Sequence, residues 1–188
     1  MTGNNSKLGF TLAEILVTVG IFAITVIISS GIFINVNNLQ QQAASMERLQ
    51  NEGRYVLEKI GKEIRGRELD YSQLVFSSTG LVDSLVFKKD EFGEVLELDF
   101  NKNSKSILFT LDGEMGRNSA QLNSSDVLVD KALFLVNPQD DPYSLFSTST
   151  PFAQPRVTIL LSLKNKNMPE RYQRSLDLQT TFSSKVYR

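Results

Sequence analysis

Residues 10–34 read Phe10-Thr11-Leu12-Ala13-Glu14 followed by ILVTVGIFAITVIISSGIFI, and this stretch decides how the chain is organised. Apart from Glu14 it contains only apolar, small or weakly polar residues, and no charged residue occurs from Ile15 to Ser45. At 1.5 Å per residue the stretch makes a helix of roughly 37 Å. A hydrocarbon core is about 30 Å thick. Residues 10–34 therefore predict a helix that crosses a membrane.

The pattern after residue 34 predicts that the helix continues as an amphipathic half over residues 35–66. Proline is absent here, and apolar residues recur three or four positions apart, which is the helical period. They are Leu39, Ala43, Met46, Leu49, Val56, Leu57, Ile60 and Ile64. The polar positions offer ion pairs four residues apart, namely Arg48–Glu52, Glu58–Lys62, Lys59–Glu63 and Glu63–Arg67. We expect one helix from about Phe10 to about Arg65, with an apolar stripe that the remaining chain must cover.

The remaining residues, 67–188, predict a β-rich globular head. Short runs rich in Val, Leu, Ile, Phe and Thr alternate with Gly and Asn turn signals. The expected strands are Leu81–Lys88, Glu94–Phe100, Ser106–Leu111, Val127–Val136, Arg156–Leu163 and Arg174–Phe182. The absence of further helical patterns between them favours antiparallel pairing. The predicted fold class is α+β, a long N-terminal helix packed against a mainly antiparallel head.

Composition excludes several function classes. The chain has 188 residues, and 20 Lys and Arg stand against 21 Asp and Glu, a balance that argues against nucleic-acid binding through a basic excess. There is no cysteine and no histidine, so the commonest nucleophiles, general bases and transition-metal ligands are missing. Carboxylates in the head show no spacing that singles out a catalytic pair. We therefore expect no enzyme, no cofactor and no metal site.

One long segment, residues 137–155, fits no strand. It reads NPQDDPYSLFSTSTPFAQP and holds four of the five prolines. A loop of this length is usually functional or disordered. Two interpretations stay open: a mobile surface loop, or a partner-contact loop with Tyr143, Phe146 and Phe152 as exposed anchors.

Glu14 is the most informative residue, because a carboxylate inside a spanning helix is costly to insert. In one interpretation it lies near the membrane edge and reaches water. In the other it meets a positive partner, which the apolar run itself does not contain. Cleavage just before Phe10 would create an α-amine one helical turn away. The pairing could also run between chains and hold their membrane helices in register.

Lys7-Leu8-Gly9 followed by Phe10-Thr11-Leu12-Ala13-Glu14 resembles the class III signal of type IV pilins and pseudopilins. The resemblance implies that residues 1–9 are a leader, removed by a membrane prepilin peptidase between Gly9 and Phe10. It also implies N-methylation of Phe10, and pairing of Glu14 with the methylated amine of a neighbouring subunit during assembly. The implied partners are the prepilin peptidase, other pilin or pseudopilin subunits through the N-terminal helix, and an inner-membrane assembly platform.

A second resemblance involves residues 50–66, QNEGRYVLEKIGKEIRG, which are similar to the end of the long helix in minor pseudopilins of the J type and in PilW-like minor pilins. Together the two resemblances imply a structural subunit held in the cytoplasmic (inner) membrane by a single pass, with the head outside the cytoplasm. Such a subunit is assembled into a type IV pilus or a type II secretion or competence pseudopilus. The alternative is a membrane-anchored extracytoplasmic binding module that enters no filament.

Overall fold

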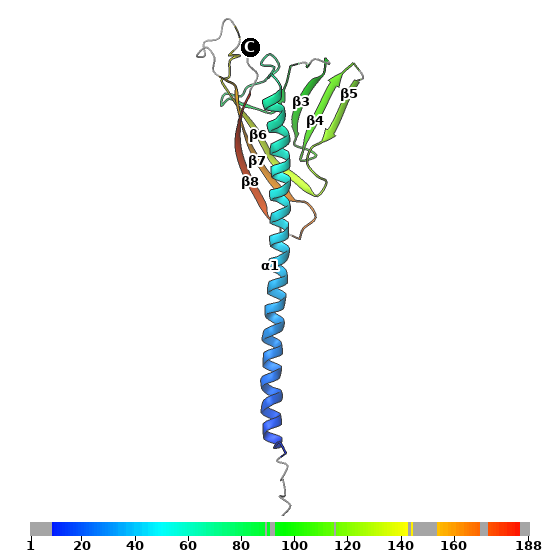
Figure 1. Cartoon of the computed structure of the whole chain (residues 1–188), viewed down its shortest axis with the longest axis vertical. Coiled ribbons are helices and arrows are strands. Elements are labelled where there is room, and N and C mark those ends of the chain that lie inside the picture. The colour runs from blue at the N-terminus through cyan, green and yellow to red at the C-terminus, as the bar shows by residue number, and fades with distance from the viewer. Residues whose placement is uncertain are drawn as a thin grey trace, which may run out of the picture. The chain divides into compact units, whose positions relative to one another are not determined.

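The computed structural model of the chain describes residues 9–88, 90, 93–114, 116–142, 144, 154–169 and 173–184. One long helix, α1, runs from Leu12 to Gly66 (Figure 1). The chain divides into two compact units, residues 1–42 and residues 43–188. The first unit contains the apolar part of α1. The second contains the last part of α1 and all the strands, so the boundary between the units falls within the helix.

The strands of the second unit form two four-stranded antiparallel sheets (Figure 1). The first sheet has the order β1-β6-β7-β8, with β1 at Leu81–Val82, β6 at Val127–Asn137, β7 at Arg156–Asn165 and β8 at Ser175–Ser183. The second has the order β2-β3-β4-β5, with β2 at Ser84–Val86, β3 at Val95–Asn101, β4 at Ser106–Gly113 and β5 at Gly116–Gln121.

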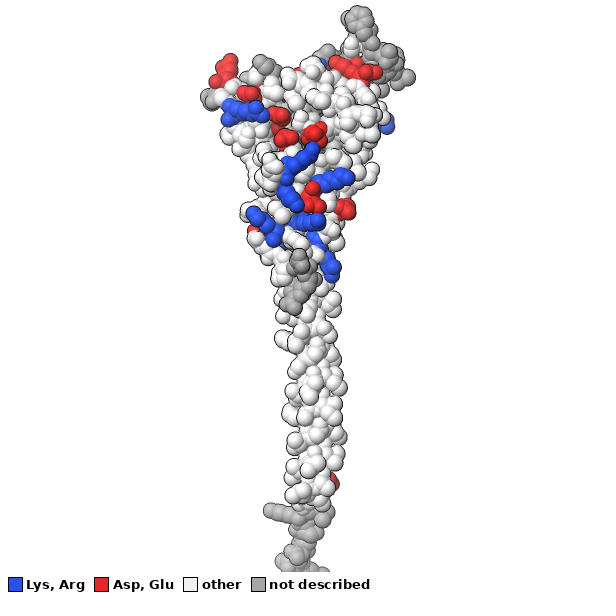
Figure 2. Space-filling view, turned by 180° about the vertical axis from the view of Figure 1, so that it is seen from behind, with Lys and Arg blue, Asp and Glu red and all other residues white. Residues whose placement is uncertain are grey.

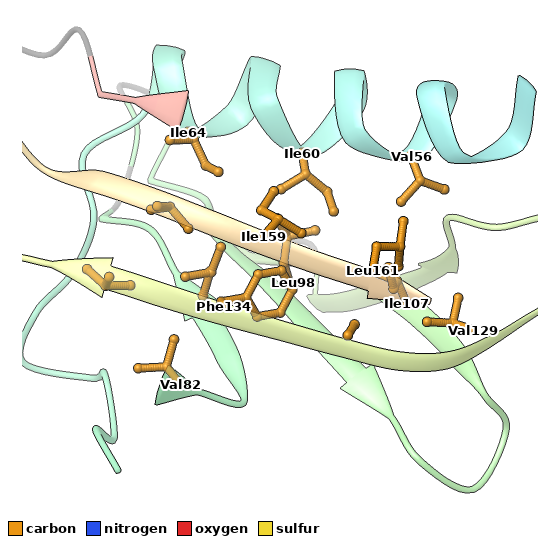
Figure 3. Packing of buried hydrophobic residues seen from close by; sticks show 14 of the residues in the cluster. Val56, Ile60, Ile64, Val82, Leu98, Ile107, Val129, Phe134, Ile159 and Leu161 are labelled. Atoms are coloured by element: carbon orange, nitrogen blue, oxygen red, sulfur yellow. The ribbon is translucent and has the colours of Figure 1, made fainter. Parts of the chain in front are cut away.

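The core of the second unit lies between α1 and the inner faces of the sheets. Val56, Ile60 and Ile64 point from one side of the helix toward the strands (Figure 3). Phe134 of β6 and Ile159 of β7 belong to the same buried cluster. These side chains are fully enclosed because apolar residues four positions apart line one side of the helix, and apolar residues two positions apart line the facing side of the strands. The head thus covers the predicted apolar stripe at Leu49, Val56, Ile60 and Ile64.

Two helix glycines let β8 approach α1 closely. A Cβ atom built at Gly61 would lie 2.5 Å from the Phe182 ring, and one built at Gly53 would overlap the Leu178 side chain. Real Cβ contacts do not occur at such distances. A side chain at either position would push β8 away from the helix, so the close packing depends on glycine at both. Sequence periodicity did not predict their burial, because glycine carries no apolar signal.

Polar contacts fasten the loops to this core. The Asn165 amide donates to the backbone oxygen of Ser45 at 3.2 Å and to its hydroxyl, and both residues are buried. At the β3–β4 turn Lys105 adopts a positive φ of 51°. Its carbonyl oxygen accepts a hydrogen bond from Val129 in β6 at 2.8 Å, which ties the second sheet to the first.

The α+β fold, the antiparallel pairing and the extent of the long helix are confirmed, and five of the six expected strands occur within two residues of their expected bounds. The sixth, expected over Leu81–Lys88, was wrong as a single strand. It breaks at the exposed Asp83 into β1 and β2, which belong to different sheets. Strand β5 was missed, since its sequence GRNSAQ is polar and every residue is exposed.

The predicted helix surface also needs correction. Leu39 and Ala43 are exposed rather than part of the buried stripe, whereas Ser45 is buried. Of the four expected ion pairs only Glu63–Arg67 forms among the described residues, with 3.1 Å between Oε2 and Nε. The Glu52 carboxylate instead accepts a hydrogen bond from the backbone N–H of Ser124. Glu52 thus makes a tertiary hydrogen bond in place of the local ion pair, which would stabilise a helix by only about 0.3 kcal/mol.

Candidate functional site

Helix α1 begins with a reciprocal hydrogen-bonded cap formed by Thr11 and Glu14. The Thr11 backbone N–H donates to Glu14 Oε2 at 2.9 Å, and the Glu14 backbone N–H donates to Thr11 Oγ1 at 3.3 Å. The Thr11 hydroxyl also donates to Glu14 Oε2 at 2.9 Å. This is a capping box, in which the first helical turn satisfies two backbone donors that have no helical partner. The Glu14 carboxylate is therefore held at the very start of the helix.

The bond expected to be cut lies immediately before this cap. Gly9 and Phe10 precede the helix and are exposed, Phe10 to 84% of its surface. Among the described residues, no atom beyond the two chain neighbours of Gly9 lies within 4 Å of its Cβ position. The other leader residues, 1–8, including Lys7 and Leu8, lie outside the described residues. The peptide bond between Gly9 and Phe10 is thus open to approach.

The cap also places the Glu14 carboxylate near the atom that cleavage would change. Glu14 Oε2 accepts from the amide of Thr11, one residue after Phe10. A cut before Phe10 would convert the Phe10 amide into an ammonium group one residue from the N–H that Glu14 already binds. The same carboxylate could then face an intramolecular amine, or an amine of a neighbouring chain if one approached the helix start.

The first unit's helix presents apolar side chains to its surroundings. α1 contains a stretch long and apolar enough to cross a membrane, and none of that stretch is buried within the protein. The surface of this part of the helix is almost wholly free of charged side chains in the space-filling view (Figure 2). Soluble monomers rarely leave apolar surface of this extent bare, so this part of α1 is a candidate membrane span.

Polar side chains inside this stretch are satisfied by the helix itself. The hydroxyls of Thr18, Thr25 and Ser30 each donate to the backbone oxygen four residues earlier, at 2.7, 2.9 and 2.8 Å. In hydrocarbon an unpaired hydroxyl is costly, and bonding back to the helix removes that cost. These residues therefore do not argue against a membrane location.

The second unit, by contrast, carries charged side chains of both signs interspersed on the face seen in Figure 2. Asp130 accepts hydrogen bonds from Lys105 at 3.0 Å and from Lys164 at 2.9 Å. These two hydrogen bonds, the Lys164 bond first, hold the pKa of Asp130 below its usual range. The cluster joins the β3–β4 turn to β6 and β7.

No group of three or more metal-ligating side chains comes together among the described residues. Several carboxylates of the head are engaged in ion pairs. Asp130 is held by two lysines, and Asp90 lies 3.2 Å from the Arg67 guanidinium. The further pairs among the described residues include Glu68–Lys88, Asp83–Lys102 and Glu97–Arg117. The three aromatic residues expected as anchors in the 137–155 loop, Tyr143, Phe146 and Phe152, lie outside the described residues.

The structure brings together Gly9, Phe10 and Glu14 at one helix terminus, the three residues that the sequence singled out. The residue that sequence reasoning missed is Thr11, which shares the cap with Glu14. Its signal was present: threonine followed three residues later by glutamate, directly before an apolar run, is a capping-box pattern. Glu14 therefore has a local structural role in addition to any role in assembly.

No protein-family model, no curated protein and no solved structure matches this chain.

Proposed function

We propose that this chain is a pilin-like structural subunit, a minor pseudopilin or minor pilin held in the cytoplasmic membrane before assembly. A prepilin peptidase removes residues 1–9, and Phe10 is then N-methylated. The processed helix anchors the subunit with its head outside the cytoplasm, and an inner-membrane platform assembles it with related subunits into a type IV pilus or a secretion or competence pseudopilus. The subunit performs no catalysis in this scheme.

The observation that carries the proposal is the geometry of the helix start. An exposed Gly9–Phe10 bond directly precedes a cap whose carboxylate is the only charge before residue 47 in the described helix. Cleavage there would supply the ammonium group that a carboxylate in an apolar helix needs. The apolar, outward-facing residues of the first unit provide both the membrane anchor and a surface for packing against other helices.

The first test is the mass and N-terminal sequence of the protein purified from membranes of a host with a prepilin peptidase. The proposal expects a chain that begins at Phe10 and carries one added methyl group. A chain that retains Met1, or one cut elsewhere, refutes the processing. Retention of the leader would instead favour the alternative, a membrane-anchored binding module that is not assembled.

A second test separates the two roles of Glu14. Glu14→Gln keeps a residue that can complete the capping box but removes the charge. Thr11→Ala keeps the charge but removes the hydroxyl of the cap. The proposal expects both variants to insert and be processed, and expects only Glu14→Gln to lose incorporation into sheared filaments. Equal loss in both variants would mean that the cap alone explains Glu14, and normal incorporation of Glu14→Gln would remove the pairing role.

A further inference from the structure

The outer edge of β8 differs from the other sheet edges of the second unit. β8 is the last strand of its sheet and pairs with β7 over nine consecutive residue pairs, from Ser175 to Ser183, without a register shift. Along an edge strand of this kind, alternate backbone N–H and C=O groups point away from the sheet. In the described part of the chain no further strand pairs with them.

Proteins usually protect such edges, and three of the four edges here are protected. Strand β1 has two residues and β2 has three, which is too short to template a partner. Strand β5 has six residues, all exposed and without a large apolar side chain. β8, with the sequence SLDLQTTFS, has nine residues and contains no proline, no lysine, no arginine and a single charge at Asp177.

The side chains of β8 also leave the core incompletely covered at this edge. Leu176, Leu178 and Phe182 lie on the face toward α1 and pack against the core, yet all three remain half-buried. The alternate residues, among them Asp177 and Gln179, are exposed on the other face. An added strand with the same alternation would bury more of the apolar row and leave its own polar side chains in water.

The direction of β8 limits what the added strand can be. Gly53 of α1 contacts Leu178, and Gly61 contacts Phe182. From Gly53 to Gly61 the helix advances about 12 Å, and from Leu178 to Phe182 the strand advances about 13 Å. Because the two contacts follow the same order along both elements, β8 runs alongside α1 in the same direction. A twofold antiparallel pairing of β8 with β8 of a second copy would reverse α1 in that copy. Residue 43, at which the second unit begins, would then lie at opposite ends of the dimer in the two copies. Such a dimer is incompatible with both chains entering one membrane from the same side.

We propose that the β8 edge is a β-augmentation site for an extended segment of a different polypeptide. The segment alternates apolar and polar residues, places its apolar side chains beside Leu176, Leu178 and Phe182, and carries a basic residue near Asp177. Backbone hydrogen bonds supply affinity, and the alternating side chains supply specificity. The choice of a different polypeptide rests on the membrane anchoring in the proposed function, while the availability of the edge does not.

The test uses the full-length protein in lipid nanodiscs and a synthetic peptide with the β7 sequence RVTILLSLKN. This peptide already has the side-chain alternation that suits β8, and it carries two positive charges, at the positions of Arg156 and Lys164. Residue-resolved amide hydrogen exchange is measured with the peptide, with a scrambled peptide of the same composition, and without peptide. The proposal expects the β8 amides that point away from β7 to exchange roughly tenfold more slowly, or slower still, with the matching peptide only.

Two matched variants locate the effect. Gln179→Lys places a charge beside the added strand, as protected natural edges do, and should abolish the slowing. Ala120→Lys places the same charge on the exposed β5 edge and should leave it unchanged. The inference is overturned if exchange does not respond to the peptide, or if Gln179→Lys and Ala120→Lys respond alike. It is equally overturned if the outward amides are already protected in the free protein, by its own chain or by a second copy at raised concentration.

These outcomes are independent of the tests of processing. An uncut N-terminus together with peptide-dependent protection of β8 would refute the proposed function and leave the edge site standing. A cut and methylated N-terminus together with unresponsive exchange would refute the edge site alone.

Discussion

Gly61→Ala is the substitution whose outcome the structure determines most sharply, because two opposing terms act on one methyl group. Alanine is a better helix former than glycine by about 1 kcal/mol, which favours the variant. The new Cβ would, however, lie 2.5, 2.6 and 3.0 Å from three atoms of the Phe182 ring. Carbon atoms pack at about 3.5–4.0 Å, so the ring or the strand must move by about 1 Å.

The steric term should exceed the gain in helix propensity. The Phe182 ring is rigid, packs against the core and has the Arg65 guanidinium 5.1 Å from its centroid. Overpacking of this kind costs about 1–3 kcal/mol. Subtracting about 1 kcal/mol of helix propensity, we expect Gly61→Ala to lower the free energy of unfolding by about 1 kcal/mol.

Gly66→Ala is the matched control. Gly66 ends the same helix, and among the described residues no atom outside its own stretch of helix lies within 4 Å of its Cβ position. We expect it to leave stability unchanged or raise it by up to about 1 kcal/mol. Urea unfolding of the full chain in detergent, followed by the circular dichroism of the β-rich unit, measures both. Equal stability of the two variants would refute the close contact, and so would a failure of Phe182→Leu to relieve the cost of Gly61→Ala in a double-mutant cycle.

Three further substitutions test the packing and the electrostatics by the same unfolding measurement. Ile60→Ala should lower stability by about 2–5 kcal/mol, because Ile60 is fully buried between α1 and the strands and its removal leaves a cavity. Asn165→Ala should cost about 1–3 kcal/mol, since the buried Ser45 hydroxyl and carbonyl lose their shared donor. Asp130 has a lowered pKa in the folded state, so its ion pairs stabilise the fold at neutral pH, and this contribution is lost as the pH falls below about 4. Because the pairs are exposed, Asp130→Asn should cost less than about 1 kcal/mol at neutral pH and should flatten the pH dependence of stability in the acid range; an unchanged acid profile would contradict this.

The sequence was most predictive where a periodic pattern continued over many residues. The long helix could be bounded to within two residues of Leu12 and Gly66, because an uninterrupted run without proline leaves few alternatives. Strands with alternating burial, such as β3 and β7, were found for the same reason. β5 could not be found this way, since a strand with every side chain in water owes its place to hydrogen bonds with β4 rather than to burial.

The helix start was only partly predictable. Gly9, Phe10 and Glu14 stand out through their residue types and spacing alone. The direction of the Glu14 carboxylate does not, since it depends on the backbone turning into helix at Thr11. The fold therefore gives Glu14 a second role, as a capping residue, which the comparison of Glu14→Gln with Thr11→Ala separates from assembly.

By itself, the sequence determined that an apolar helix with a single charge, at Glu14, precedes a water-compatible α+β unit, because hydrophobic periodicity and charge are local properties of the chain. Only the tertiary structure decided which sheet each strand joins, which glycines allow β8 to lie against α1, and which strands lie at the edges of the two sheets. Those features depend on contacts between residues far apart in the chain. Their free energies arise only when the elements pack, so no local pattern encodes them.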